Sequence, residues 1–148
     1  MILDPPLPTK LLRPIDDSRH RRRVERIVDV FSVAFSDIRY DVYWQSRVAN
    51  AQAFLWAGER CVRLYGGLAR HRGLTVAGIA WVLAHETGHH LGGPPYHELQ
   101  PALSSEAAST AWAIDHGLKR AFGPALAKRY VVIGCRELSQ YSLTKKIY

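Results

Sequence analysis

Residues 81–93 read WVLAHETGHHLGG, which places His85, Glu86 and His89 in the order H-E-x-x-H. On an α-helix, histidines four residues apart project from one face, so both imidazoles can reach a single divalent ion. Glu86 lies beside them and can take a proton from a water that the metal activates, instead of binding the metal itself. The pattern therefore predicts a catalytic zinc site in which His85 and His89 are ligands and Glu86 is the general base.

The flanking residues predict that this stretch lies on a buried helix from about Thr75 to Leu91. Thr75 is a favourable N-cap, apolar residues recur at helical spacing, and the sequence GGPP at residues 92–95 would end the helix just past the ligands. The competing interpretation is an ordinary core helix with solvated polar residues at its end. We favour the metal site, because two adjacent histidines and a glutamate on such an apolar helix are costly to bury without a partner.

The length and composition of the chain predict one soluble globular domain that spans residues 1–148. With 47% hydrophobic and 22% charged residues, such a chain can bury a core without disulfides. Cys61 and Cys135 are far apart and lack C-x-x-C spacing, so both are expected to be buried free thiols. No secretory signal opens the chain and no apolar run approaches the length of a membrane span, so we expect a cytoplasmic protein without a membrane span.

Basic residues are concentrated early in a chain whose formal net charge is +7. Six arginines crowd into residues 13–26. This clustering indicates a local basic patch and argues against a nucleic-acid-binding face. Two interpretations of the patch stay open: a solvated face whose arginines pair with acidic loops, or a surface for an anionic partner.

Changes of hydrophobic period along the chain predict an α+β fold. Residues 1–15 carry four of the eight prolines and should form an extended arm that lies over the surface or is partly disordered. An amphipathic helix should follow over residues 18–36. Alternation over residues 38–44 predicts a half-buried strand, and apolar runs at 51–57 and 61–65 around a glycine-containing turn predict a hairpin. We therefore expect a small, mostly antiparallel sheet of three or four strands packed on the metal helix.

Beyond the metal helix, a loop at residues 93–103 leads into two further helices. Two serines followed by Glu106 predict the start of a helix over residues 105–121. Gly123 and Pro124 then separate it from a last helix over residues 124–140. The helix that begins near Glu106 can return against the metal helix.

A catalytic zinc also needs a third protein ligand and one open position for water. The metzincin pattern would place a histidine at position 95, which is Pro95. His97 lies two residues later, on a loop that could bend back, so it stays open as a ligand that no spacing rule supports. Glu106 is the strongest candidate, because a returning helix can offer its first-turn carboxylate to a metal held by the two histidines. The alternative explanation of Glu106 is an acidic residue favoured by the helix dipole.

The order of these motifs resembles the gluzincin metallopeptidases, especially the minimal soluble ones related to the catalytic core of the CAAX-prenyl and HtpX-like proteases. Those families pass from a strand beginning Asn-Ala-x-Ala, through a hairpin and a glycine turn, into a helix with the pattern V-L-A-H-E-x-G-H-H. The similarity covers about residues 48–115, with Asn50-Ala51-Gln52-Ala53, Gly66-Gly67-Leu68, Leu74-Thr75 and Val82-Leu83-Ala84-His85-Glu86-Thr87-Gly88-His89-His90. The next helix resembles the family's E-x-x-A-D-x-x-A at Glu106, Ser109 and Ala113, but Thr110 stands where an aspartate usually orients a zinc histidine.

The resemblance implies a zincin-like α+β fold in which the sheet covers one side of the metal helix and its edge strand borders the cleft. It implies Zn²⁺ held by His85, His89 and Glu106 as the cofactor. It also implies a peptide or protein substrate that adds to the edge strand through main-chain hydrogen bonds.

The expected activity is zinc-dependent hydrolysis of peptide bonds with Glu86 as the base. Three residues, Tyr96, His97 and His116, are candidates for stabilising the oxyanion. Two alternatives stay open: a regulatory zincin like the IrrE-like peptidases, acting on a protein partner, and a catalytically decayed zincin that serves as a binding module, which Thr110 would mark. The intact Glu86 argues against the second, because a structural zinc site has no use for a base. The sequence does not indicate an oligomeric state.

Overall fold

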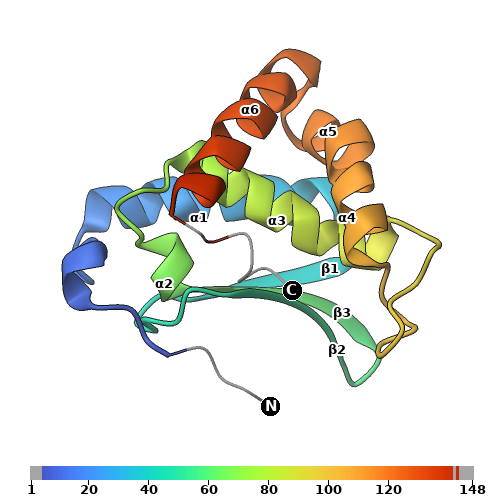
Figure 1. Ribbon diagram of the computed structural model, residues 1–148, viewed down its shortest axis with the longest axis horizontal. Coiled ribbons are helices and arrows are strands. Elements are labelled where there is room, and N and C mark those ends of the chain that lie inside the picture. Colours follow the sequence, from blue (N-terminus) through green and yellow to red (C-terminus); the bar gives the residue numbers. More distant parts are fainter. Residues whose placement is uncertain (1–4, 142, 144–148) are drawn as a thin grey trace.

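The structure, a computed structural model, describes residues 5–141 and Leu143. A three-stranded sheet forms one layer and helices form the other, which is an α+β architecture (Figure 1). The elements in chain order are η1 (Thr9–Leu11), α1 (Ser18–Ala34), β1 (Ile38–Tyr43), β2 (Ala51–Trp56), β3 (Glu59–Tyr65), α2 (Gly66–Ala69), α3 (Val76–Leu91), α4 (Glu106–Trp112), η2 (Ala113–Gly117), α5 (Leu118–Phe122) and α6 (Pro124–Gln140).

The sheet is mixed, so the expectation of a mostly antiparallel sheet is wrong. Its strand order is β1-β3-β2, in which β2 and β3 pair antiparallel while β1 and β3 pair parallel. β2 and β3 form the predicted hairpin, and its turn residues Ala57 and Gly58 both have positive φ, at 51° and 80°, as a tight hairpin turn requires. The second strand of this hairpin, not the first, lies against β1. Alternating hydrophobicity could not show this, because it specifies the face of a residue and not the neighbour of a strand.

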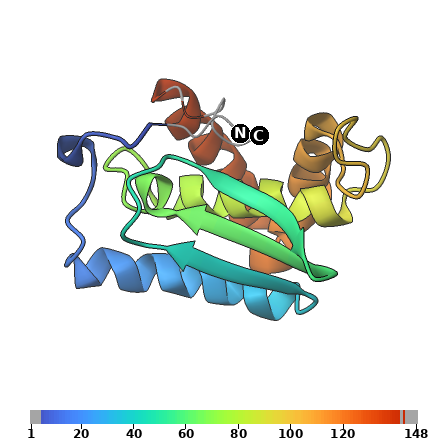
Figure 2. The same ribbon diagram turned by 90° about the horizontal axis from the view of Figure 1, so that it is seen from below.

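Helices α1 and α3 lie side by side on one face of the sheet (Figure 2). Alternate strand residues point toward them, and Ile38, Val62 and Leu64 are buried in the core beside these helices. On the opposite face, Arg63 of β3 donates two hydrogen bonds to the Asp41 carboxylate of β1, at 3.0 and 3.1 Å. Strand β1 is therefore half-buried, as the alternation over residues 38–44 predicts.

Helix α3 lies at the centre of the molecule, with the sheet on one side and α4, α5 and α6 on the other (Figure 1). Fourteen of its sixteen residues are buried. The helix predicted over residues 105–121 is present from Glu106 to Phe122, but it is not regular. Its middle, Ala113–Gly117, is the π-helical turn η2 between α4 and α5. Such turns occur frequently near functional sites.

The described part of the predicted N-terminal arm lies along the surface. Pro6 pairs with Val48 and Leu12 pairs with His71, with the short turn η1 between them. Residues 1–4 of the predicted arm lie outside the described residues. The arm is therefore attached at two points and contributes Leu12 to the buried interior.

The two cysteines differ in exposure. Both are free, and Cys61 is buried, but Cys135 is only half-buried, so the prediction of two buried thiols is wrong for Cys135. The physical reason is that α6, which carries Cys135, packs one side against α3 and leaves its other side in solvent. No helix in the described part of the chain is both long and apolar enough to cross a membrane.

Candidate metal centre

Helix α3 is held at its N-terminus by a buried carboxylate. Thr75 caps the helix as predicted, its hydroxyl accepting from the Ala77 amide at 3.3 Å. Glu137 of α6 accepts further hydrogen bonds from the amide and hydroxyl of Thr75 and from the amide of Gly78, at 2.9 to 3.1 Å. The first N–H groups of a helix lack partners within the helix and carry partial positive charge, so this carboxylate both satisfies and stabilises them.

Near the other end of α3, His85, Glu86 and His89 come together as the H-E-x-x-H pattern predicts. One ligand atom from each residue lies within 4.8 Å of the others, and all three side chains are buried. The two imidazole rings have their centroids 4.9 Å apart and are perpendicular. These three groups can therefore hold a metal ion.

Glu106 reaches both histidines from the first turn of α4. Its Oε2 lies 2.9 Å from Nε2 of His85, and its Oε1 lies 3.3 Å from Nε2 of His89. The hydroxyl of Ser105 caps α4 by accepting from the Ala108 amide at 3.2 Å, which fixes where the helix begins. Glu106, the predicted third ligand, therefore faces the same two nitrogens that the H-E-x-x-H pattern supplies.

The Nδ1 atom of each ring, opposite the Nε2 atom that faces Glu106, has a partner of its own. Nδ1 of His89 lies 2.7 Å from the Ser104 carbonyl oxygen, which can only accept, so this nitrogen carries the ring proton. Nδ1 of His85 lies 3.0 Å from the Thr110 hydroxyl. Metal-binding histidines are oriented by outer partners of this kind. Thr110 stands where the families that the sequence resembles have an aspartate, so here His85 contacts a neutral hydroxyl instead of a carboxylate.

Close packing between α3 and α4 sets these distances. A Cβ atom on Gly88 would lie 2.5 Å from the Ser109 carbonyl oxygen, so glycine is required for this approach. The Ser109 hydroxyl donates to the His85 carbonyl oxygen, which joins the two helices directly. The result is that Glu106 and Thr110, on one side of α4, both touch His85.

Glu86 is a buried carboxylate with one unused oxygen. The residue is 2% exposed, and its Oε1 has no hydrogen-bond partner among the described residues. Burial raises the pKa of Glu86 well above its usual value, the charge of Glu106 raises it further, and the Ala53 amide lowers it. Such an oxygen, beside two histidine nitrogens and a second carboxylate, fits a site for a cation, because a cation would offset the negative charge that makes this burial costly.

The charge of Glu106 is controlled by the two histidines. Burial raises the pKa of Glu106, but hydrogen bonds to His85 and His89 outweigh this effect and hold the pKa at about 2. Burial lowers the pKa of His89, and its contacts with Glu106 and the Ser104 carbonyl more than offset that lowering. Glu106 is therefore ionised near neutral pH. Two imidazole nitrogens with one carboxylate form the donor set of His₂Glu catalytic zinc sites.

A small cavity of about 80 Å³ opens beside this centre. It is lined by Gln52, Ala53, Glu86, His89, His97, Gln100, Leu103 and Glu106. Of the predicted oxyanion candidates, His97 therefore borders the cavity beside the candidate metal centre. Tyr96 does not line this cavity; it is 53% exposed and pairs with Ser104. His90, next to His89, has a structural role instead, because its Nε2 lies 2.8 Å from the Cys61 carbonyl oxygen and attaches α3 to β3.

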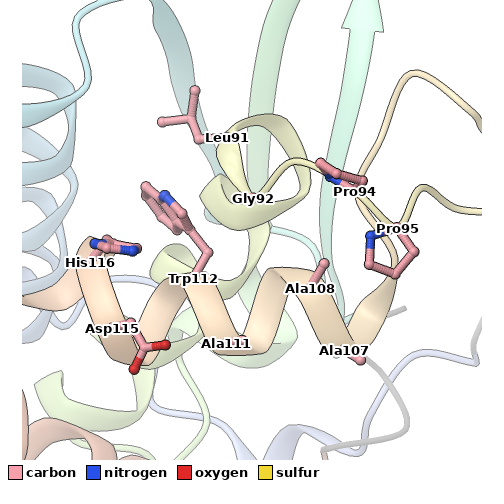
Figure 3. Close-up of a pocket in the computed structure, with 10 residues that line it drawn as sticks. All are labelled: Leu91, Gly92, Pro94, Pro95, Ala107, Ala108, Ala111, Trp112, Asp115 and His116. Carbon is pink, nitrogen blue, oxygen red and sulfur yellow. The ribbon is translucent and has the colours of Figure 1, made fainter.

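His116 and Asp115 lie in a separate groove (Figure 3). The groove has a volume of about 800 Å³ and is formed by the end of α3, two prolines of the following loop, and α4 with η2. Figure 3 shows the prolines at one end and Asp115 and His116 at the other. The two lining sets share no residue, so neither Asp115 nor His116 borders the cavity at the metal centre.

Sequence reasoning missed Gln100 and the Ser104 carbonyl as parts of the centre. Gln100 belongs to no motif, and Ser104 acts through its backbone, which every residue possesses. Only the shape of the loop between α3 and α4 brings these groups to the histidines. No signal in the sequence could have identified them.

Comparison of the chain with models of known protein families, with curated proteins and with solved structures finds no significant match. The resemblance to the gluzincins therefore stays a prediction. It rests on the motifs and on the geometry of the centre.

Proposed function

We propose that the protein is a zinc-dependent metallopeptidase of the zincin type, which hydrolyses peptide bonds. The observation that carries this proposal is the convergence of Nε2 of His85 and Nε2 of His89 on the Glu106 carboxylate, at 2.9 and 3.3 Å. Structural zinc sites are almost always closed by four protein ligands, whereas this arrangement offers three and adds the buried Glu86. The donor set therefore favours a catalytic site over a structural one.

Each residue of the centre has a role in the proposed reaction. His85, His89 and Glu106 would hold zinc, which would polarise a peptide carbonyl and lower the pKa of a water molecule. Glu86 takes the proton of that water and later passes it to the leaving amine. Burial suits Glu86 to both transfers, since it raises the pKa of the carboxyl toward the working pH.

Strand β2 supports a peptide as the substrate. It lies at the edge of the sheet, and its neighbour Asn50 accepts a hydrogen bond from the Tyr65 amide at 3.0 Å. Hydrogen-bonded pairs alternate along antiparallel strands, so the main-chain groups of Ala51 and Ala53 point away from β3. The Ala51 amide donates to Oδ1 of Asn50 at 2.9 Å and the Ala53 amide contacts Glu86, so the carbonyl groups of the two residues are the ones left to face the open edge. Ala53 also lines the cavity with Glu86. An extended peptide that pairs with this edge would bring its main chain beside the metal centre.

The test combines zinc content with peptide hydrolysis for the wild type and the Glu86→Gln variant. We expect one zinc per chain in both, and a rate of hydrolysis of a diverse peptide library about 100-fold to 10,000-fold lower in the variant, because an amide cannot accept the proton. Glu98→Gln changes an exposed carboxyl of the loop and should keep the wild-type rate. Equal turnover by Glu86→Gln would contradict the assigned role, and a zinc-loaded wild type without hydrolysis would favour the binding module.

A further inference from the structure

The loop between α3 and α4 has a fixed shape. Three contacts close it on itself: the bridge between Tyr96 and Ser104, the His97 amide donating to the Leu103 carbonyl (2.8 Å), and the Ser105 amide donating to the Pro95 carbonyl (2.9 Å). The closed loop ends directly at the cap of α4 and at Glu106. The backbone that positions Glu106 therefore also positions His97, whose side chain lines the cavity with Glu86 and His89.

The protonation of the His97 ring follows from one backbone contact. The Leu99 amide donates to Nδ1 of His97 at 3.2 Å. A backbone N–H can only donate, so Nδ1 must be the accepting nitrogen and the neutral ring carries its proton on Nε2. His97 therefore presents an N–H donor, on the ring nitrogen that the loop does not use.

The other candidate donors are placed differently. Tyr96 is exposed outside the cavity, and His116 lies in the separate groove of Figure 3. Gln100 does line the cavity and carries a side-chain amide. Among the described residues, the side-chain amide of Gln100 makes no hydrogen bond that would fix its orientation, whereas the Leu99 amide fixes the ring of His97. His97 is therefore the donor with a defined orientation.

We infer that His97 donates a hydrogen bond to the carbonyl oxygen of the scissile peptide as that oxygen becomes an anion; the inference rests on the proposed peptidase function. In the first step the water oxygen bonds to the carbonyl carbon, the π pair moves onto the carbonyl oxygen, and the water proton moves to Glu86. In the second step the pair on the oxyanion re-forms the C=O bond, the C–N bond breaks with its electron pair staying on nitrogen, and the proton of Glu86 moves to that nitrogen. His97 keeps its own proton throughout and stabilises the charge that develops between the two steps.

The first test reads the tautomer without any activity. Side-chain ¹⁵N NMR of the zinc-loaded, full-length wild type at pH 8 should show the His97 proton on Nε2, with His97→Gln used to assign the signals. A proton on Nδ1 would overturn the inference whatever the enzyme does.

The second test measures binding of a phosphinic peptide, whose tetrahedral anion resembles the intermediate. His97→Ala should weaken this binding and lower kcat by about 100-fold to 1,000-fold, the effect of removing one oxyanion donor. Zinc content and KM for the matching substrate should stay unchanged, and His97→Gln should recover part of the loss. His116→Ala is the matched control and should behave as the wild type.

The outcomes separate this inference from the proposed function. If the wild type hydrolyses peptides while His97→Ala keeps its rate and its affinity for the phosphinic peptide, His97 is not the donor and the peptidase function stands. If Gln100→Ala instead produces the loss, the donor is Gln100 and the inference is overturned. A wild type that neither hydrolyses peptides nor binds the phosphinic peptide would overturn both.

Discussion

Two buried glutamates contact helix α3 and are used in opposite ways. Glu137 lies at the N-terminus of the helix, and both of its oxygens accept hydrogen bonds from Thr75 or Gly78. Glu86 lies on the helix itself, with Oε1 unpartnered among the described residues and a second carboxylate nearby. A saturated carboxylate stabilises the fold, whereas an unsaturated one destabilises it and persists where a free lone pair has chemical use. The same type of side chain therefore lies both at the N-terminal end of α3, where it is structural, and at the candidate metal centre.

The largest effect is expected from removing Glu106, the residue that faces both histidines at the candidate metal centre. If structural zinc binding of about 10 to 16 kcal/mol is shared by four ligands, one ligand contributes about 3 kcal/mol, so Glu106→Ala should lower zinc affinity by roughly 100-fold to 1,000-fold. Competition with a chelator measures this affinity. Glu98→Ala removes an exposed loop carboxylate and should leave it unchanged. Wild-type zinc affinity in Glu106→Ala would exclude Glu106 as a ligand.

The next largest effect is expected at the N-terminal end of α3, where Glu137 binds. Glu137→Ala should lower the free energy of unfolding by about 2 to 4 kcal/mol, because it leaves the amides of Thr75 and Gly78 buried without acceptors. Urea denaturation measures the change. Glu137→Gln keeps one acceptor oxygen and should lose less. If Glu137→Ala proved as stable as the wild type, α3 would not depend on this carboxylate.

At the candidate metal centre, replacing a buried glutamate with glutamine should instead stabilise the protein. Glu86→Gln should raise the free energy of unfolding of the metal-free protein by about 1 to 3 kcal/mol at pH 8, since it removes a buried charge with an unpartnered oxygen. Burial holds the folded-state pKa of Glu86 above its ordinary value of 4.5, so the wild type loses stability as pH rises through that folded-state pKa. Below pH 4.5 the carboxyl is protonated in both states, and the gain should disappear. Urea denaturation at pH 4 and pH 8 tests this, and a gain of equal size at both would point to a cause other than charge.

The two ends of α3 also differ in how many of their contacting residues could be predicted from the sequence. His85, Glu86 and His89 could be predicted, because helical periodicity alone places them on neighbouring positions of one helix. Glu106 required the further assumption that the next helix returns, which the close packing at Gly88 makes possible.

Long-range packing could not be predicted in the same way. Glu137 is separated from Thr75 by 62 positions, and no local pattern relates the two. The parallel pairing of β1 with β3 and the π-helical turn η2 likewise depend on which surfaces meet in the folded chain. Hydrophobic period specifies which face of an element is buried, and it carries no information about what covers that face.

The smallest effect is expected at Thr110, the hydroxyl partner of His85. Thr110→Val keeps the shape of the side chain and removes the contact, so zinc affinity should fall by about 10-fold. Thr110→Asp should raise the affinity by a similar factor, since a carboxylate is the stronger acceptor for an imidazole N–H. Chelator competition on both variants measures the change. An unchanged affinity in Thr110→Val would show that the contact does not orient the ring.

The contact between His85 and Glu106 closes a loop of only 21 positions along the chain. Chain entropy opposes the closure of such a loop by about 3 kcal/mol, and each doubling of its length would add only about 0.6 kcal/mol. The loop includes Ser104 and His97 as well as both histidines of the centre, so the closure of this one loop makes all of these groups neighbours. The centre thus lies within one short hairpin of helices, and a bound zinc ion would add its binding free energy directly to the stability of that unit.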